Sequence, residues 1–206
     1  MLNAPKQTQR TLPPVGTHIA RCIGLIYLGT VKTEWQGQEK WLDKVRLTWE
    51  LPEELHSFKD GEDKKPFVVS REFTLSMGDK SNLYPIVSGI VGDIPEDVRN
   101  SFDHEELVGT TCLLTLVHKE SPNGKYALIT TTAPLMKSMK APEAINESKI
   151  LTYENWDQEY FDSLPDFIKD KMKGSKQYVK KFGGSGMTDD EANEELDEIS
   201  SGDIPF

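Results

Sequence analysis

Residues 41–51 read Trp41-Leu42-Asp43-Lys44-Val45-Arg46-Leu47-Thr48-Trp49-Glu50-Leu51. From position 44 onward, polar and apolar side chains alternate, and this period of two is typical of a β-strand with one buried face. The predicted buried face comprises Val45, Leu47, Trp49 and Leu51. The predicted polar face comprises Lys44, Arg46, Thr48 and Glu50. We expect Pro52 to end the strand, because proline cannot donate a hydrogen bond to a strand ladder.

Further strand patterns lie on both sides of this stretch, over residues 16–28, 67–75, 110–119 and 126–133. In the first of these strands we expect Gly24 to mark a bulge and Gly29 to form the end. Gln36-Gly37 is the expected turn in the connection that follows. Ser121-Pro122-Asn123-Gly124 predicts a tight hairpin between the last two strands. Arg71 shares the parity of the apolar residues around it, so its strand either bulges or has a partly open face.

The spacing of apolar residues changes after the third predicted strand. Residues 79–90 place Leu83, Ile86, Val87 and Ile90 at helical spacing. Asp79 is the expected cap, and Pro85 predicts a short or kinked helix. The resulting order is three strands, a helix and two strands. This is the order of the OB-fold, a mainly β, five-stranded Greek-key barrel with one helix between its third and fourth strands, although small mixed domains can share it.

We divide the chain into four parts. Residues 1–14 form a polar, flexible arm, and residues 15–134 form the OB-fold domain. Residues 135–182 form a crossover and a helical extension, which we expect to pack on the barrel through its aromatic side chains. In this extension, Ser163 is the expected cap of a helix that has Pro165 in its first turn. Residues 183–206 form a Gly-rich linker and an acidic tail.

The net charge of −10 is concentrated in the tail. Of the 34 acidic residues, eight lie in residues 187–206, which contain no Lys or Arg. The preceding residues carry 26 acidic and 24 basic side chains, a net charge of −2. This asymmetry allows a basic groove on the body of the protein and excludes a globally cationic nucleic-acid binder. A tail this acidic cannot bury enough apolar surface to offset the conformational entropy that it would lose on ordering. We therefore expect it to be disordered.

Several classes of protein are disfavoured. No run of residues approaches the ~18 apolar residues of a membrane span, so no membrane partner is expected. Cys22 and Cys112 lack metal-ligand spacing, which favours buried thiols in the reducing cytoplasm. The catalytic motifs of phosphate loops, nucleophile elbows and zinc proteases are absent from the sequence. We therefore expect no enzyme activity, no cofactor and no metal, although a nuclease with scattered carboxylates stays open.

The tail ends in Asp203-Ile204-Pro205-Phe206, which resembles the C-terminal tip of bacterial single-stranded DNA-binding proteins. The family usually has a row of Asp directly before Ile-Pro-Phe, whereas Ser200-Ser201-Gly202 interrupts the acidic residues here. The helical extension looks like the segment that closes phage-encoded OB-fold proteins of this kind. The resemblance implies a phage-type single-stranded DNA-binding protein in the bacterial host cytoplasm. It also implies that Asp203, Ile204, Pro205 and Phe206 bind replication, recombination or repair proteins.

A single-strand binding surface combines cations that track phosphates with aromatic side chains on which bases stack. OB-folds bind on the face of strands two and three and on the adjoining loops. The predicted DNA-binding residues are Trp35, Trp41, Lys44, Arg46, Arg71, Phe73, His118, Lys119, Lys125 and Tyr126. Trp41 could equally be a core residue, and Tyr126 could simply pack. Arg71 and Phe73 join the site only if their strand bulges.

Two functions stay open from the residues. In the first, the protein binds single-stranded DNA without sequence preference, and the tail both recruits partners and competes for the basic groove. In the second, it is an accessory protein that mimics the host tail without binding DNA itself. Either function is compatible with a homo-oligomer.

Overall fold

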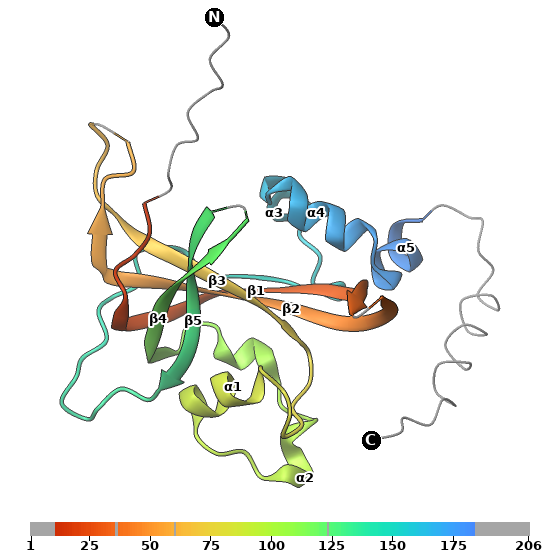
Figure 1. Ribbon diagram of the computed structural model, residues 1–206, viewed down its shortest axis with the longest axis horizontal. Helices are drawn as coiled ribbons and strands as arrows, with labels where there is room; N and C mark the ends of the chain where they lie inside the picture. The colour runs from red at the N-terminus through yellow and green to blue at the C-terminus, as the bar shows by residue number, and fades with distance from the viewer. Residues whose placement is uncertain (1–10, 36, 60, 123, 184–206) are drawn as a thin grey trace, which may run out of the picture.

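The computed structural model describes residues 11–35, 37–59, 61–122 and 124–183 (Figure 1). Its strands are β1 (Gly16–Trp35), β2 (Gln38–His56), β3 (Lys65–Thr74), β4 (Thr111–Ser121), β5 (Gly124–Ala133) and β6 (Lys149–Leu151). Its helices are α1 (Tyr84–Val91), α2 (Glu96–Arg99), the 3-10 helix η1 (His104–Leu107), α3 (Gln158–Ser163), α4 (Asp166–Lys173) and α5 (Lys176–Phe182). The prediction of a mainly β chain, with helix between the third and fourth strands, is confirmed.

The five long strands form one antiparallel sheet in the order β3-β2-β1-β4-β5. β1 lies at its centre, pairing with β2 and β4 and, over residues 24–26, with the short parallel strand β6. In Figure 1, α1 and α2 lie on one side of the sheet and α3, α4 and α5 on the other. β3 and β5 are the ends of the strand order. Arg71 on β3 donates from Nη1 to the carbonyl oxygen of Ile129 on β5 over 2.6 Å, so the two end strands lie close together.

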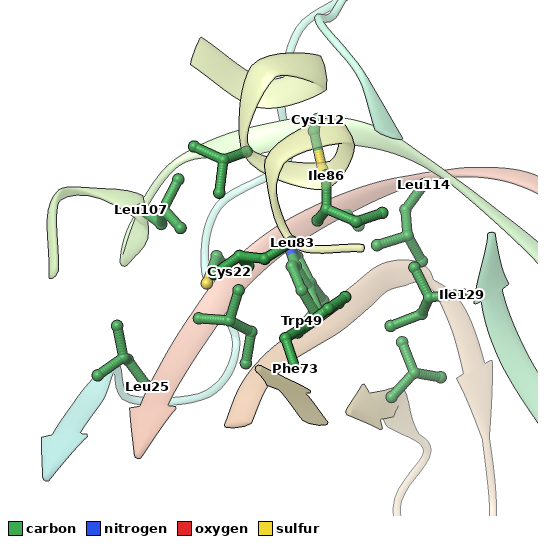
Figure 2. Packing of buried hydrophobic residues seen from close by; sticks show 14 of the residues in the cluster. Cys22, Leu25, Trp49, Phe73, Leu83, Ile86, Leu107, Cys112, Leu114 and Ile129 are labelled. Carbon is green, nitrogen blue, oxygen red and sulfur yellow. The ribbon is translucent and has the colours of Figure 1, made fainter. Parts of the chain in front are cut away.

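The predicted apolar face of β2 is buried in the main core. Val45, Leu47, Trp49 and Leu51 are each exposed by 2% or less. Trp49, Phe73 and Leu83 lie together at the centre of this cluster, so two strands and the segment leading into α1 share one core (Figure 2). Burying a side chain of this size contributes ~1.5–3 kcal/mol relative to leaving it exposed.

A second apolar cluster lies between β1 and the C-terminal helices. Its buried members are Ile26, Leu28, Leu151, Tyr153, Phe161, Leu164, Ile168 and Met172. The Tyr153 hydroxyl donates to the Leu28 carbonyl over 3.1 Å and lies 2.7 Å from the hydroxyl of Ser175. β1 is therefore buried on both faces, which explains why its apolar residues do not alternate strictly.

Gly29 does not end the first strand as predicted. β1 continues to Trp35, which pairs with Gln38 across the turn at Gly37. Gly29 instead has a φ of 87°, and a Cβ there would lie 2.7 Å from the side chain of Ser175. The glycine thus permits the close approach of α5 to β1. The expected bulge at Gly24 is confirmed by a register shift between Cys22 and Gly24.

Pro52 does not end β2 either. The register between β2 and β3 shifts between Leu51 and Leu55, so Pro52 lies in an irregular segment that has no partner in the ladder. Its missing N–H group therefore costs no strand hydrogen bond. The tight hairpin predicted between β4 and β5 is confirmed by the pairing of Ser121 with Gly124.

The two predicted helix caps are wrong. Asp79 forms an ion pair with Arg99 at 2.7 Å, and it is the Ser81 hydroxyl that accepts from the backbone N–H of Leu83 before α1. Ser163 is the last residue of α3, and its hydroxyl donates back to the Tyr160 carbonyl. Short side chains near a helix boundary satisfy either end, so the sequence pattern could not choose between them. Pro85 lies in the first turn of the eight-residue α1, in agreement with the prediction of a short helix.

Glu50 departs from the predicted polar face of β2 because it is completely buried. Its carboxylate accepts from the backbone N–H groups of Ile145 and Asn146 at 3.1 and 2.9 Å, and from Asn146 Nδ2 at 2.8 Å. These bonds fasten the crossover between β5 and β6 to the outer face of the sheet. A buried carboxylate is tolerated here because backbone and side-chain donors replace its lost hydration.

We expect Glu50→Ala to destabilise the protein by about 1–3 kcal/mol, since it removes the acceptor of three partly buried hydrogen bonds. Glu50→Gln should cost less, because its amide oxygen can still accept. Urea unfolding followed by circular dichroism measures both changes. Glu53→Ala, at an exposed position of the same strand, is the control. Equal stability of Glu50→Ala and the control would contradict the anchoring role.

The buried thiols predict a loss of stability at alkaline pH. Burial raises the pKa of Cys22 and of Cys112 from 9.0 to about 12. Above pH 9.0 the unfolded thiols ionise while the folded ones stay protonated, so stability is complete below that pH and falls as the pH rises towards about 12. Urea unfolding at about pH 8 and about pH 10.5 should therefore show a smaller pH effect in the Cys22→Ala/Cys112→Ala variant than in the wild type. Equal pH effects in the two proteins would contradict this.

Candidate nucleic-acid interface

A groove lies between the β1–β2 hairpin and the C-terminal end of α4. Its lining residues are Val31, Lys32, Thr33, Lys44, Glu72, Asp170, Lys171 and Gly174, and its volume is about 470 Å³. We call it the hairpin groove. Three of its four elements are strands of the sheet, and the fourth is held against β1 by the second apolar cluster. The groove is therefore framed by packed elements of the fold and lined by three lysines and two carboxylates.

Trp41 lies on β2 close to this groove and is 39% exposed. It pairs across the hairpin with Lys32, one of the lining residues. The ammonium group of Lys176, on α5, lies 5.0 Å from the centre of the indole ring. The alternative that Trp41 is a core residue is therefore wrong, although its parity matches that of Val45. An exposed indole beside two lysines combines a stacking surface with positive charge.

Lys44 and Arg46 lie on the outer face of β2, as predicted, and both contact β3. Lys44 Nζ donates to Thr74 Oγ1 over 2.7 Å, and Arg46 Nη1 lies 3.3 Å from Glu72 Oε1. Partial burial lowers the pKa of Lys44, while the charge of Glu72 opposes that shift. Phe167 on α4 covers the Arg46 guanidinium, with the ring centre 5.7 Å away.

The C-terminal extension covers part of the face that the sequence assigned to DNA. α4 reaches β3 through Lys171, whose Nζ lies 2.5 Å from Glu72 Oε2. Further along β2, the crossover segment between β5 and β6 donates hydrogen bonds to the Glu50 carboxylate. The middle of the β2–β3 face is therefore shared with the protein's own chain, and the open surface is displaced towards the hairpin groove.

Arg71 and Phe73 do not belong to an exposed site. The register between β2 and β3 is continuous from Lys44 to Leu51, so no bulge turns these side chains outward. Phe73 is 2% exposed in the main core. The Arg71 guanidinium lies over the Phe73 ring at 4.8 Å and bonds to β5, which explains how a charged side chain is tolerated at an inward position.

The β4–β5 hairpin carries a separate group of predicted residues. Lys119 and Tyr126 face each other across the strands, and both are exposed, as is Lys125. His118 is not free, because its Nε2 donates to the Pro13 carbonyl over 2.9 Å. No hydrogen bond or ion pair described for Lys119, Lys125 or Tyr126 joins them to a residue that lines the hairpin groove. Lys119, Lys125 and Tyr126 thus form one group on the β4–β5 hairpin, and Trp41, Lys44 and Arg46 form another on β2.

Some predicted positions lie outside the described residues. They are the tail residues Asp203, Ile204, Pro205 and Phe206, together with the side chain of Trp35. Sequence reasoning also missed three cations, namely Lys32, Lys171 and Lys176. Lys171 and Lys176 belong to a basic run that is visible in the sequence, but only folding brings them beside β2. Lys32 lay in a presumed loop, so its position opposite Trp41 became apparent only with the extended hairpin.

Within the described part of the chain, no three His, Cys, Asp or Glu side chains converge in a way that could hold a metal ion. None of its helices combines the length and the apolar character needed to cross a bilayer.

No protein-family model and no curated protein matches the chain.

Proposed function

We propose that this protein binds single-stranded DNA without sequence preference and has no catalytic role. The observation that carries the proposal is the exposed indole of Trp41, with Lys176 against it and with Lys32, Lys44 and Lys171 along the adjoining groove. Single-strand binding needs both an aromatic ring and cations, because bases stack on aromatic rings and phosphates bind to cations. Neither kind of contact distinguishes one base sequence from another.

The sheet supports an OB-type, five-stranded Greek-key barrel as the binding platform. Its order leaves β3 and β5 as the end strands, and the Arg71–Ile129 hydrogen bond draws these ends together. α1 falls between β3 and β4 in the chain, as the helix of an OB-fold does. Thr132 on β5 donates to the Ile86 carbonyl, and this contact packs α1 beside the closing strand.

The tail supplies the partner-binding function in this proposal. Its last four residues, Asp203 to Phe206, resemble the tip with which bacterial single-stranded DNA-binding proteins recruit other proteins. The expected partners are replication, recombination or repair proteins of a bacterial host. The apolar tip is the argument against a mere solubility tag, because solubility does not need a terminal phenylalanine.

Replacing Trp41 by alanine tests the groove. We expect a loss of about 1–3 kcal/mol in binding, or ~5–150-fold in Kd, for an oligo-dT of about 30 nucleotides at low salt. Fluorescence anisotropy of the labelled oligonucleotide measures this. Phe58→Ala is the matched control, because Phe58 is an aromatic residue, 48% exposed, that lies between β2 and β3 and does not line the groove. An unchanged Kd for Trp41→Ala, or an equal loss in the control, would contradict the assignment.

A second candidate is an accessory protein that carries the host-type tail without binding DNA. The observation that favours it is the partial covering of the β2–β3 face by α4 and the crossover segment. The wild-type titration separates the two functions. Absence of oligo-dT binding at low salt would favour the accessory protein.

Truncation tests the tail. Deleting residues 187–206 removes eight tethered carboxylates, which compete with phosphates at high effective concentration. We expect oligo-dT to bind more tightly to the truncated protein at low salt, with the difference shrinking at high salt. Deleting Phe206 alone should leave DNA affinity unchanged and abolish binding to a host protein that recognises bacterial tails of this type. Weaker DNA binding after truncation would contradict the competition.

A further inference from the structure

One carboxylate in the hairpin groove is held by cations from two different elements. Glu72 Oε1 lies 3.3 Å from Arg46 Nη1, and Glu72 Oε2 lies 2.5 Å from Lys171 Nζ. Arg46 belongs to β2 and Lys171 to α4, so the carboxylate bridges the sheet and the helix. Lys44 lines the same groove and places a third cation nearby.

This arrangement resembles a phosphate site occupied by the protein's own side chain. Each carboxylate oxygen takes one cation, as two oxygens of a bound phosphate would. The side chains of Glu72, Arg46 and Lys171 are 25%, 20% and 46% exposed, so solvent reaches all three. Ion pairs that solvent reaches are weak, so replacing one anion by another costs little free energy.

The position of Glu72 is also unnecessary for the pairing of the strands. β2 and β3 are already joined around it by a continuous ladder and by the Thr48–Ser70 hydrogen bond at 3.0 Å. Asp170 lines the groove as well, but among the described contacts no cation pairs with it. Glu72 is thus the lining carboxylate that neutralises Arg46 and Lys171.

We propose that Glu72 is an intramolecular competitor for a DNA backbone phosphate at a subsite formed by Arg46, Lys171 and Lys44. The inference rests on the proposed function and adds regulation of its affinity. With Glu72 in place, the cations are held in position but largely neutralised, and a phosphate must displace the carboxylate to bind. The bound strand therefore gains less affinity than the number of cations suggests, and its salt dependence is shallower than the full set of cations would give.

Glu72→Gln tests this proposal in the full-length protein. The amide is nearly isosteric and can still accept a hydrogen bond, but it no longer neutralises Arg46 or Lys171. We expect oligo-dT affinity at low salt to rise about tenfold, and the log–log salt slope to steepen by about 0.7 for each additional phosphate contact. Lys171→Gln should have the opposite effect, with weaker binding and a shallower slope. Thermal melting of each variant confirms that it is folded.

Glu62→Gln is the charge-matched control, because Glu62 pairs with Lys59 between β2 and β3 and does not line the groove. A rise in affinity common to both Glu→Gln variants would show a general charge effect and overturn the subsite. Unchanged or weaker binding by Glu72→Gln, while the wild type binds, would also overturn it and leave the proposed function standing. Absence of binding by every variant and the wild type would overturn both. Tighter binding of inorganic triphosphate without tighter binding of oligo-dT would assign the subsite to free phosphates instead.

Discussion

β1 buries apolar side chains on both faces, and the arrangement of the other elements follows from that. Cys22 and Leu25 enter the main core with β2 and α1, while Ile26 and Leu28 enter the second cluster with α3, α4 and α5. A strand with two apolar faces needs cover on both sides. The C-terminal helices supply the second cover, so they are part of the folded body. Gly29 allows this cover to approach closely, because any larger residue would meet Ser175.

The same packing creates the groove and limits it. α4 must lie along the sheet to cover β1, and this brings Lys171 to Glu72 and Phe167 to Arg46. The helix thereby adds a lysine to the surface of β2 and β3 but also covers part of that surface. Stability and binding are therefore coupled through one helix, since a change that loosens α4 would alter both the second cluster and the charge of the groove.

The electrostatics of the proposed interface are local. The net charge of −10 would repel nucleic acid if it were spread evenly, yet eight of the acidic residues lie in the final twenty positions. The lysines of the groove are separated from one another in sequence and are gathered by the hairpin and by α4–α5. At physiological ionic strength charges interact over about 8 Å, so the arrangement within the groove matters more than the total.

The sequence alone determined the features that depend on neighbouring residues. Alternation in residues 44–51 identified the buried face of β2, and the Ser121–Gly124 turn identified the β4–β5 hairpin. It also placed Lys44 and Arg46 on the outer face. Such features follow from the period of a strand and from turn chemistry, which act over a few residues.

Only the tertiary structure shows which of these residues are exposed and therefore available to bind a ligand. Phe73 proved to be core, Glu50 became a buried anchor, and Trp41 lies exposed beside Lys176. Gly29 lies inside β1 and leaves room for Ser175, nearly 150 positions later in the chain. Local pattern does not encode which distant segment covers a face, because that choice is made by apolar surfaces that meet only when the chain has folded.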